Sequence, residues 1–100
     1  MVKIEKEGAK VTVYPRGRID ATCAPQFASA MEEAIVGATE LVIDCTGLKY
    51  ISSSGLRAVM LVVKAMDRQG KMRIINVDQT IYETLELTGF TGVCDIEMKE

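Results

Sequence analysis

The sequence contains no histidine, and only 5% of its residues are aromatic. Histidine is the commonest general base and metal ligand near neutral pH, so its absence makes most enzyme hypotheses harder to support. Cys23, Cys45 and Cys94 are odd in number, widely spaced and form no Cys-x-x-Cys pair. This pattern argues against a disulfide framework or a zinc site and predicts buried free thiols. We therefore expect a protein that is not an enzyme, without metal or cofactor.

Neither a charged tail nor a long hydrophobic run is present. The 12 Lys and Arg residues are scattered among 14 Asp and Glu residues, for a net charge of −2, so we expect no nucleic-acid partner. The longest aliphatic run, residues 58–63, is far shorter than the roughly 20 residues of a membrane span. The N-terminus also lacks the apolar core of a signal peptide. We expect a cytoplasmic protein without direct membrane insertion.

What the chain does contain is a composition typical of one globular domain. With 48% hydrophobic and 26% charged residues, its 100 residues are enough for a single core, and we assign residues 1–100 to a single domain. Alternating apolar and polar residues predict a hairpin of two strands at 2–6 and 10–14. A loop follows at 15–20, and helical spacing with a proline in the first turn predicts a helix over 24–36.

The second half of the chain alternates strands with helices. The predicted elements are a strand at 41–44 buried on both faces, a loop, a helix from Ser54 to Gly70, a strand at 71–77, a helix at 79–87 capped by Asp78, and a last strand near 93–98. The order of these elements predicts a mixed α/β (α+β) fold, with a mixed sheet and right-handed crossovers.

The segment YISSSGL, residues 50–56, raises the question of what three adjacent serines do. A nucleophilic serine needs a base, but the chain has no histidine, no lysine three residues after a serine, and no Gly-x-Ser-x-Gly elbow. Phosphate-cradling glycine motifs are absent as well. One serine can act as the helix N-cap, and Ser54 is a candidate for it. A phosphate on Ser53 or Ser54 would also be tolerated at a helix start while adding about 1.5 to 2 negative charges.

The segment LVIDCTGLKYISSSGLRAVMLVVKAMDRQGKMRIINV resembles the central part of the STAS family, the anti-sigma factor antagonists. The likeness extends to GRIDATCAPQF and to ETLELTGFTGVCDI, and so covers essentially the whole chain. The resemblance implies a STAS-type domain with a mixed β-sheet of about five strands that opens with a hairpin, and with helices packed mainly on one face.

The resemblance also implies a switchable protein partner. That partner is an anti-sigma factor with a histidine-kinase-like ATP-binding fold, and binding to it releases a sigma factor for transcription. The same partner phosphorylates one serine at the start of the helix, which abolishes binding. A metal-dependent serine phosphatase reverses the step. Residue by residue, the acceptor falls on Ser53, with Ser54 and Ser52 as alternatives, while Gly55 and Leu56 complete the motif. Asp44 matches the acidic residue that ends the central strand.

Asp20 matches a second acidic residue of the family, in the GRID loop near the same surface. Asp20 and Asp44 could equally be structural, because aspartate is common at strand ends and turns. The sequence departs from the family at one position. Many phosphoregulated members carry Asp immediately before the acceptor serine, and this chain has Ser52 there. This departure motivates an alternative function, in which the domain is a constitutive, non-phosphorylated scaffold or a regulatory subunit of a signalling or membrane transport complex.

Helical geometry adds a prediction of its own. At 100° per residue, the buried face of the helix carries Leu56, Val59, Met60 and Val63, and the opposite face carries Arg57, Leu61, Lys64 and Arg68. A lone exposed leucine often has no role, but Leu61 lies one to two turns beyond the serines. It is therefore a candidate anchor within a basic rim for an acidic partner surface. The candidate partner-binding residues are Asp20, Asp44, Ser52, Ser53, Ser54, Gly55, Arg57 and Leu61.

Overall fold

The computed structural model describes residues 2–99. In chain order its elements are β1 Val2–Glu7, β2 Lys10–Pro15, β3 Gly17–Ile19, α1 Ala24–Ala34, β4 Glu40–Asp44, β5 Leu48–Ile51, α2 Ser53–Gln69, β6 Lys71–Val77, α3 Gln79–Leu87, a 3-10 helix η1 Phe90–Gly92 and β7 Asp95–Met98. Each helix and strand predicted from the sequence is present, with its ends within a few residues of the prediction.

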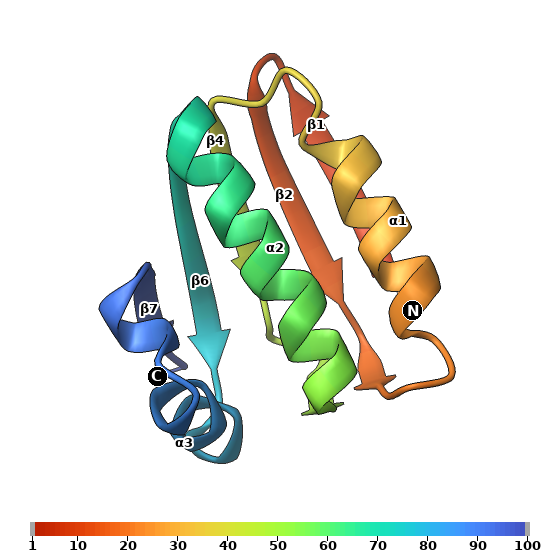
Figure 1. Ribbon diagram of the computed structural model, residues 1–100, viewed down its shortest axis with the longest axis vertical. Coiled ribbons are helices and arrows are strands. Elements are labelled where there is room, and N and C mark those ends of the chain that lie inside the picture. The colour runs from red at the N-terminus through yellow and green to blue at the C-terminus, as the bar shows by residue number, and fades with distance from the viewer. Residues whose placement is uncertain (1, 100) are drawn as a thin grey trace.

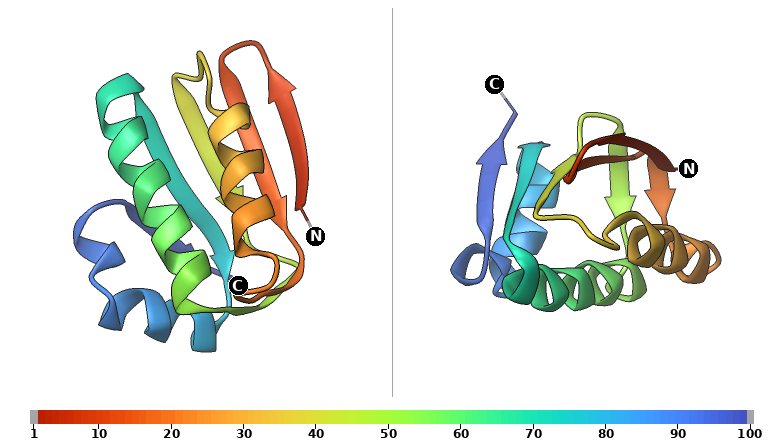
Figure 2. Two further views of the ribbon diagram at one scale, coloured as in Figure 1. Left: turned by 45° about the vertical axis from the view of Figure 1, so that its right-hand side comes forward. Right: turned by 90° about the horizontal axis from the view of Figure 1, so that it is seen from above.

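The main sheet has five strands in the order β1-β2-β4-β6-β7. β1 and β2 form the predicted antiparallel hairpin, and every later neighbour pairs in parallel, so the sheet is mixed. Helices α1 and α2 lie side by side on one face of this sheet, while α3 packs near the end of β6 (Figures 1 and 2). The predicted mixed α/β fold, with about five strands and helices mainly on one face, is confirmed.

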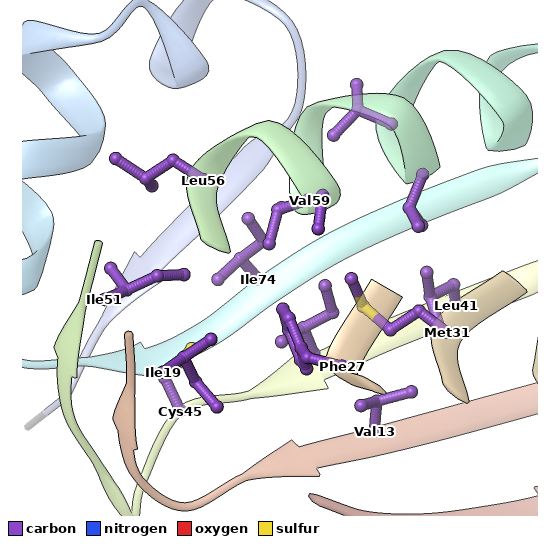
Figure 3. Close-up of a cluster of buried hydrophobic side chains, with 14 of the residues drawn as sticks. Val13, Ile19, Phe27, Met31, Leu41, Cys45, Ile51, Leu56, Val59 and Ile74 are labelled. Carbon is purple, nitrogen blue, oxygen red and sulfur yellow. The ribbon is translucent and has the colours of Figure 1, made fainter. Parts of the chain in front are cut away.

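The core lies between the sheet and the pair of helices. Figure 3 shows Phe27 and Met31 of α1 beside Val13, Leu41 and other strand residues. Alternation along a strand places every second side chain in this layer. Val42, on the opposite face of β4, is also only 4% exposed, which confirms that the central strand is buried on both faces.

A second, two-stranded sheet was not predicted. β3 and β5 pair in parallel below the ends of β2 and β4, in segments that the sequence analysis assigned to loops (Figure 1). Both strands are short, and the burial of β5 runs buried, exposed, exposed, buried instead of alternating. The loop prediction was wrong here because neither segment carries enough periodicity to indicate a strand without its partner.

The helix ends follow local chemistry. The Asp78 carboxylate accepts a hydrogen bond from the Ile81 N–H at 2.8 Å, which confirms the predicted N-cap of α3. Gly70 ends α2 as predicted, and a Cβ there would lie 1.9 Å from the carbonyl oxygen of Thr39. Glycine is thus required at this position by close packing of the backbone, not by a left-handed turn.

All three cysteines are free thiols. Cys45 is buried as predicted, and burial, reinforced by the nearby Asp44 and Asp78 carboxylates, raises its pKa to about 12. Cys23 and Cys94 are half-buried, so they are more accessible than predicted. Among residues 2–99, no helix is long and apolar enough to cross a membrane, and no group of three His, Cys, Asp or Glu residues could hold a metal ion.

Candidate partner-binding site

The two short strands bring the Asp20 loop and the serines to one edge of the molecule. Ile19 pairs with Ile51 in the parallel register, so β3 and β5 end side by side. The chain leaves β3 through Asp20 into α1, and leaves β5 through Ser52 into α2. The Ser52 N–H donates to the carbonyl oxygen of Ile19 at 2.8 Å, which joins the two exits. Sequence reasoning placed Asp20 near the serines only through the family resemblance, and this pairing is the physical reason.

The three serines occupy different positions at the start of α2. Ser52 is the N-cap, and its hydroxyl oxygen accepts a hydrogen bond from the Gly55 N–H at 3.2 Å. Ser53 is the first helical residue and is exposed, whereas Ser54 is half-buried. The expectation that Ser54 caps the helix was therefore wrong, because α2 begins one residue earlier. Of the three hydroxyl groups, that of Ser53 is the most accessible to another protein.

Gly55 is buried where the start of α2 packs against β3 and β5, and it is not part of the surface. A Cβ on this residue would lie 2.7 Å from Cγ1 of Ile51 and 2.9 Å from Cγ2 of Ile19. Figure 3 shows both isoleucines reaching toward the first turn of α2, near Leu56. The glycine lets α2 start directly against the ends of β3 and β5, and thereby holds the serines in place.

The Asp20 side chain orders its own loop. Its carboxylate accepts hydrogen bonds from the N–H and the hydroxyl group of Thr22. These bonds lower the pKa of the Asp20 carboxyl group below its ordinary value. Its carbonyl oxygen accepts from the Ala24 N–H at 2.9 Å, at the start of α1. The loop is thus fixed on both its side-chain and main-chain atoms, next to the serines.

Asp44 lies apart from the serines. Because Ile43 faces the helices, the next side chain points to the opposite face of the sheet, where it lines a groove with Tyr14, Arg16 and Thr46. Partial burial raises the pKa of Asp44, but hydrogen bonds from Thr46 and Asn76 outweigh that effect, so its pKa is lowered. The hydrogen bond from Asn76 to Asp44 thus links β6 to the end of β4.

A shallow groove of about 230 Å³ runs beside the serines, between the starts of α1 and α2. Arg57 and Leu61 line it, as the helical spacing predicted for an outward face, and Leu61 is 56% exposed. The α1 side was missed by sequence reasoning, and it consists of small residues: Ala21, Ala24, Pro25 and Ala28. Their small size is the signal that could have found it, because small side chains on one helix leave room beside the larger ones of its neighbour.

A second missed feature is an exposed pair on the outer side of the short sheet. The Arg18 guanidinium lies over the Tyr50 ring, 4.3 Å from its centroid, and Tyr50 is 40% exposed. The parallel register of β3 and β5 places these residues opposite each other. Such cation–π contacts are worth about 0.5–1 kcal/mol at exposed sites, so the pair braces the two strands that carry the site.

The family model of the STAS domain matches residues 1–100. The chain belongs to the STAS domain family. It is 28% identical over 102 residues to an anti-sigma-B factor antagonist of Listeria monocytogenes, covering 96% of this chain and 86% of the relative.

Solved structures share the fold of this chain at low sequence identity. An anti-sigma factor antagonist from Mycobacterium paratuberculosis superposes with a TM-score of 0.88 at 18% identity, over 97% of this chain and 84% of the other. The Bacillus cell fate determinant SpoIIAA, in its phosphorylated form, gives a TM-score of 0.77 at 17% identity, over 96% of this chain and 90% of the other. At these identities the likeness concerns the fold of the STAS domain.

Proposed function

We propose that this STAS domain is an anti-sigma factor antagonist, which binds an anti-sigma factor and so releases a sigma factor for transcription. Its STAS relative in Listeria carries that role in its name, over nearly the full length of this chain. The binding surface is the groove between α1 and α2 together with the serines and the Asp20 loop. We propose that residues 1–100 act as one domain and as a non-enzymatic binding module in the cytoplasm.

The switch is phosphorylation of Ser53. The partner is an anti-sigma factor with a histidine-kinase-like ATP-binding fold, which transfers the γ-phosphoryl group of ATP to the Ser53 oxygen while ADP and the hydroxyl proton leave. A metal-dependent serine phosphatase hydrolyses the phosphoserine and returns the free hydroxyl. Neither enzyme belongs to this chain, so the domain itself supplies only the acceptor and the docking surface.

The observation that carries this proposal is the position of Ser53. It is the exposed serine, at the first position of α2, whereas Ser52 is occupied as the cap and Ser54 is half-buried and lines the groove. A phosphate there adds about 1.5 to 2 negative charges at the edge of the binding surface without entering the core. Binding is lost while the fold is kept.

Ser52 stands where many phosphoregulated members of the family have Asp, and serine can cap α2 at this position as aspartate would. The position is the N-cap of α2, where serine and aspartate are among the preferred residues. The substitution therefore leaves the helix start intact. It removes one carboxylate from beside the acceptor, which bears on the rate of phosphorylation more than on the fold.

The experiment that tests the proposal is a titration of the cognate anti-sigma factor with wild-type protein, Ser53→Ala and Ser53→Asp. We expect Ser53→Ala to bind within about threefold of wild type. Ser53→Asp should bind at least tenfold more weakly, which corresponds to a loss of about 1.4 kcal/mol in binding free energy. Ser29→Asp, at an exposed serine of α1, is the matched control and should bind like wild type. Equal affinities of the two Ser53 variants would contradict the proposal.

A second function keeps the fold but not the switch. In that case the domain is a constitutive, non-phosphorylated scaffold or a regulatory subunit of a signalling or membrane transport complex. The observation in its favour is the missing carboxylate at position 52. Purifying the protein from its own cells separates the two functions, because association with a transporter or sensor, without any phosphorylated form by intact mass, supports the scaffold.

A further inference from the structure

Arg57 lies one helical turn beyond the proposed phosphate acceptor. Ser53 and Arg57 are four residues apart on α2, and both are exposed. Residues at this spacing are neighbours on a helix surface, with about 5–6 Å between their Cβ atoms. Helical side chains also lean toward the N-terminus, so this spacing places the long Arg57 side chain within reach of a phosphate on Ser53.

The guanidinium of Arg57 is available for a new partner. Within residues 2–99, the ion pairs are Lys3 with Glu5 and Arg73 with Glu97, so no described carboxylate lies within 4.0 Å of Arg57. In the unmodified protein Arg57 instead lines the groove beside Leu61. Its positive charge is thus part of the surface offered to a partner.

We propose that Arg57 is the intramolecular partner of phosphorylated Ser53, and that the pair withdraws this cation from the groove. The inference rests on the proposed phosphorylation of Ser53, and it adds a second effect to it. The modification adds a doubly charged anion and, at the same time, ties up the arginine closest to it. The groove edge, which carries one free positive charge before modification, then presents net negative charge to an acidic partner.

The chemistry of the pair is favourable in both type and direction. Guanidinium and phosphate groups form bidentate, charge-assisted hydrogen bonds. An acidic group followed four residues later by a basic one is the better orientation on a helix, because it agrees with the helix dipole. Lys64 and Arg68 lie too far along α2 to replace Arg57. At 1.5 Å per residue, even the nearer of the two, Lys64, is about 16 Å from Ser53 along the helix axis.

The test uses the full chain with phosphoserine installed at position 53 during translation, so that no kinase is needed. The second pKa of the phosphate, about 6 when unperturbed, is followed by ³¹P NMR in a pH titration. We expect Arg57→Gln to raise this pKa by about 0.3–0.7 units relative to the wild-type chain, since an opposite charge favours the dianion. Arg57→Lys should restore part of the shift.

Lys64→Gln is the matched control, because it removes the same charge from an exposed position on the same helix. It should leave the phosphate pKa within 0.1 units of the wild-type chain. The proposal is overturned if Arg57→Gln does not move the pKa, or if Lys64→Gln moves it equally.

This measurement involves no partner protein, so it stands apart from the proposed function. If the anti-sigma factor binds both forms equally while Arg57→Gln still shifts the pKa, the proposed switch fails and the ion pair remains. If the partner discriminates between the forms but the pKa does not respond to Arg57, the switch remains and the role of Arg57 fails.

Discussion

The N–H of Ser52 donates a hydrogen bond to the carbonyl oxygen of Ile19 at 2.8 Å. This single bond joins the loop that enters α1 to the loop that enters α2, at the point where β3 and β5 end together. The Asp20 loop and the serines therefore form one continuous surface, which is the surface that we propose for the partner. It also follows that substitutions which separate these loops weaken binding without touching a contact residue.

Gly55→Ala tests the close packing under this surface. A Cβ would lie 2.7 Å from Ile51 and 2.9 Å from Ile19, so α2 or the short strands must shift. Alanine gains about 1 kcal/mol in helix propensity, but overpacking costs typically 1–3 kcal/mol, and we expect a net loss of about 1 kcal/mol in the free energy of unfolding. This change in the free energy of unfolding is measured by urea denaturation. Gly92→Ala, with nothing within 4 Å of its Cβ, is the control, and an unchanged Gly55→Ala midpoint would refute the packing argument.

Ser52→Ala and Ser52→Asp separate capping from carboxylate chemistry. The Ser52 hydroxyl accepts from the Gly55 N–H at 3.2 Å, and loss of an N-cap costs about 1 kcal/mol. We expect Ser52→Ala to lower the free energy of unfolding by that amount and Ser52→Asp to leave it within about 0.5 kcal/mol of wild type. Urea denaturation of the three proteins is the measurement. Identical stability of wild type and Ser52→Ala would show that this hydroxyl does not cap α2.

Asp44 should make stability depend on acid. Its pKa is lowered in the folded state, so its contribution is fully present above the unfolded value near 3.8 and is lost as the pH falls through the folded value. Because the group is only partly buried, solvent screens its interactions, and we expect a contribution of less than about 1 kcal/mol. Asp44→Asn should therefore be less stable than wild type at pH 6, and this difference should shrink as the pH falls below 3.8, as measured by urea denaturation. Asp67→Asn, at an exposed aspartate of α2, is the control for loss of a surface carboxylate. A difference for Asp44→Asn that does not shrink as the pH falls would contradict the assignment.

Leu61→Ser tests whether the exposed leucine anchors the partner. Leu61 lines the groove, whereas Leu87, at 87% exposure, lies at the end of α3. We expect Leu61→Ser to weaken binding of the anti-sigma factor about tenfold, because burying a leucine is worth about 1.5–3 kcal/mol. Leu87→Ser should bind like wild type. Both variants should unfold at the same urea concentration as wild type, and equal binding by the two would remove Leu61 from the site.

The sequence was sufficient to predict the elements that carry their own periodicity. The hairpin, the doubly buried strand around Val42 and the outward face of α2 with Leu61 all follow from local patterns of two or 3.6 residues. Asp78 was recognisable as a cap because a helical pattern starts directly after it.

The remaining parts of the site depend on contacts between distant segments. β3 and β5 have three and four residues, too few to show a period, and they form because they pair with each other. The same pairing fixes the start of α2 at Ser53, which made Ser52 the cap in place of Ser54. The small residues of α1 form a groove only when α2 lies beside them. No local pattern could reveal these relationships.

We propose Ser53 as the switch of the partner-binding surface. The most direct measurement is intact-mass analysis and phosphosite mapping after incubation of the protein with the cognate anti-sigma factor and ATP. We expect a single added phosphate, located on Ser53 and absent from Ser53→Ala. A phosphate located on any other residue, or no phosphate under conditions where the two proteins bind, would contradict it.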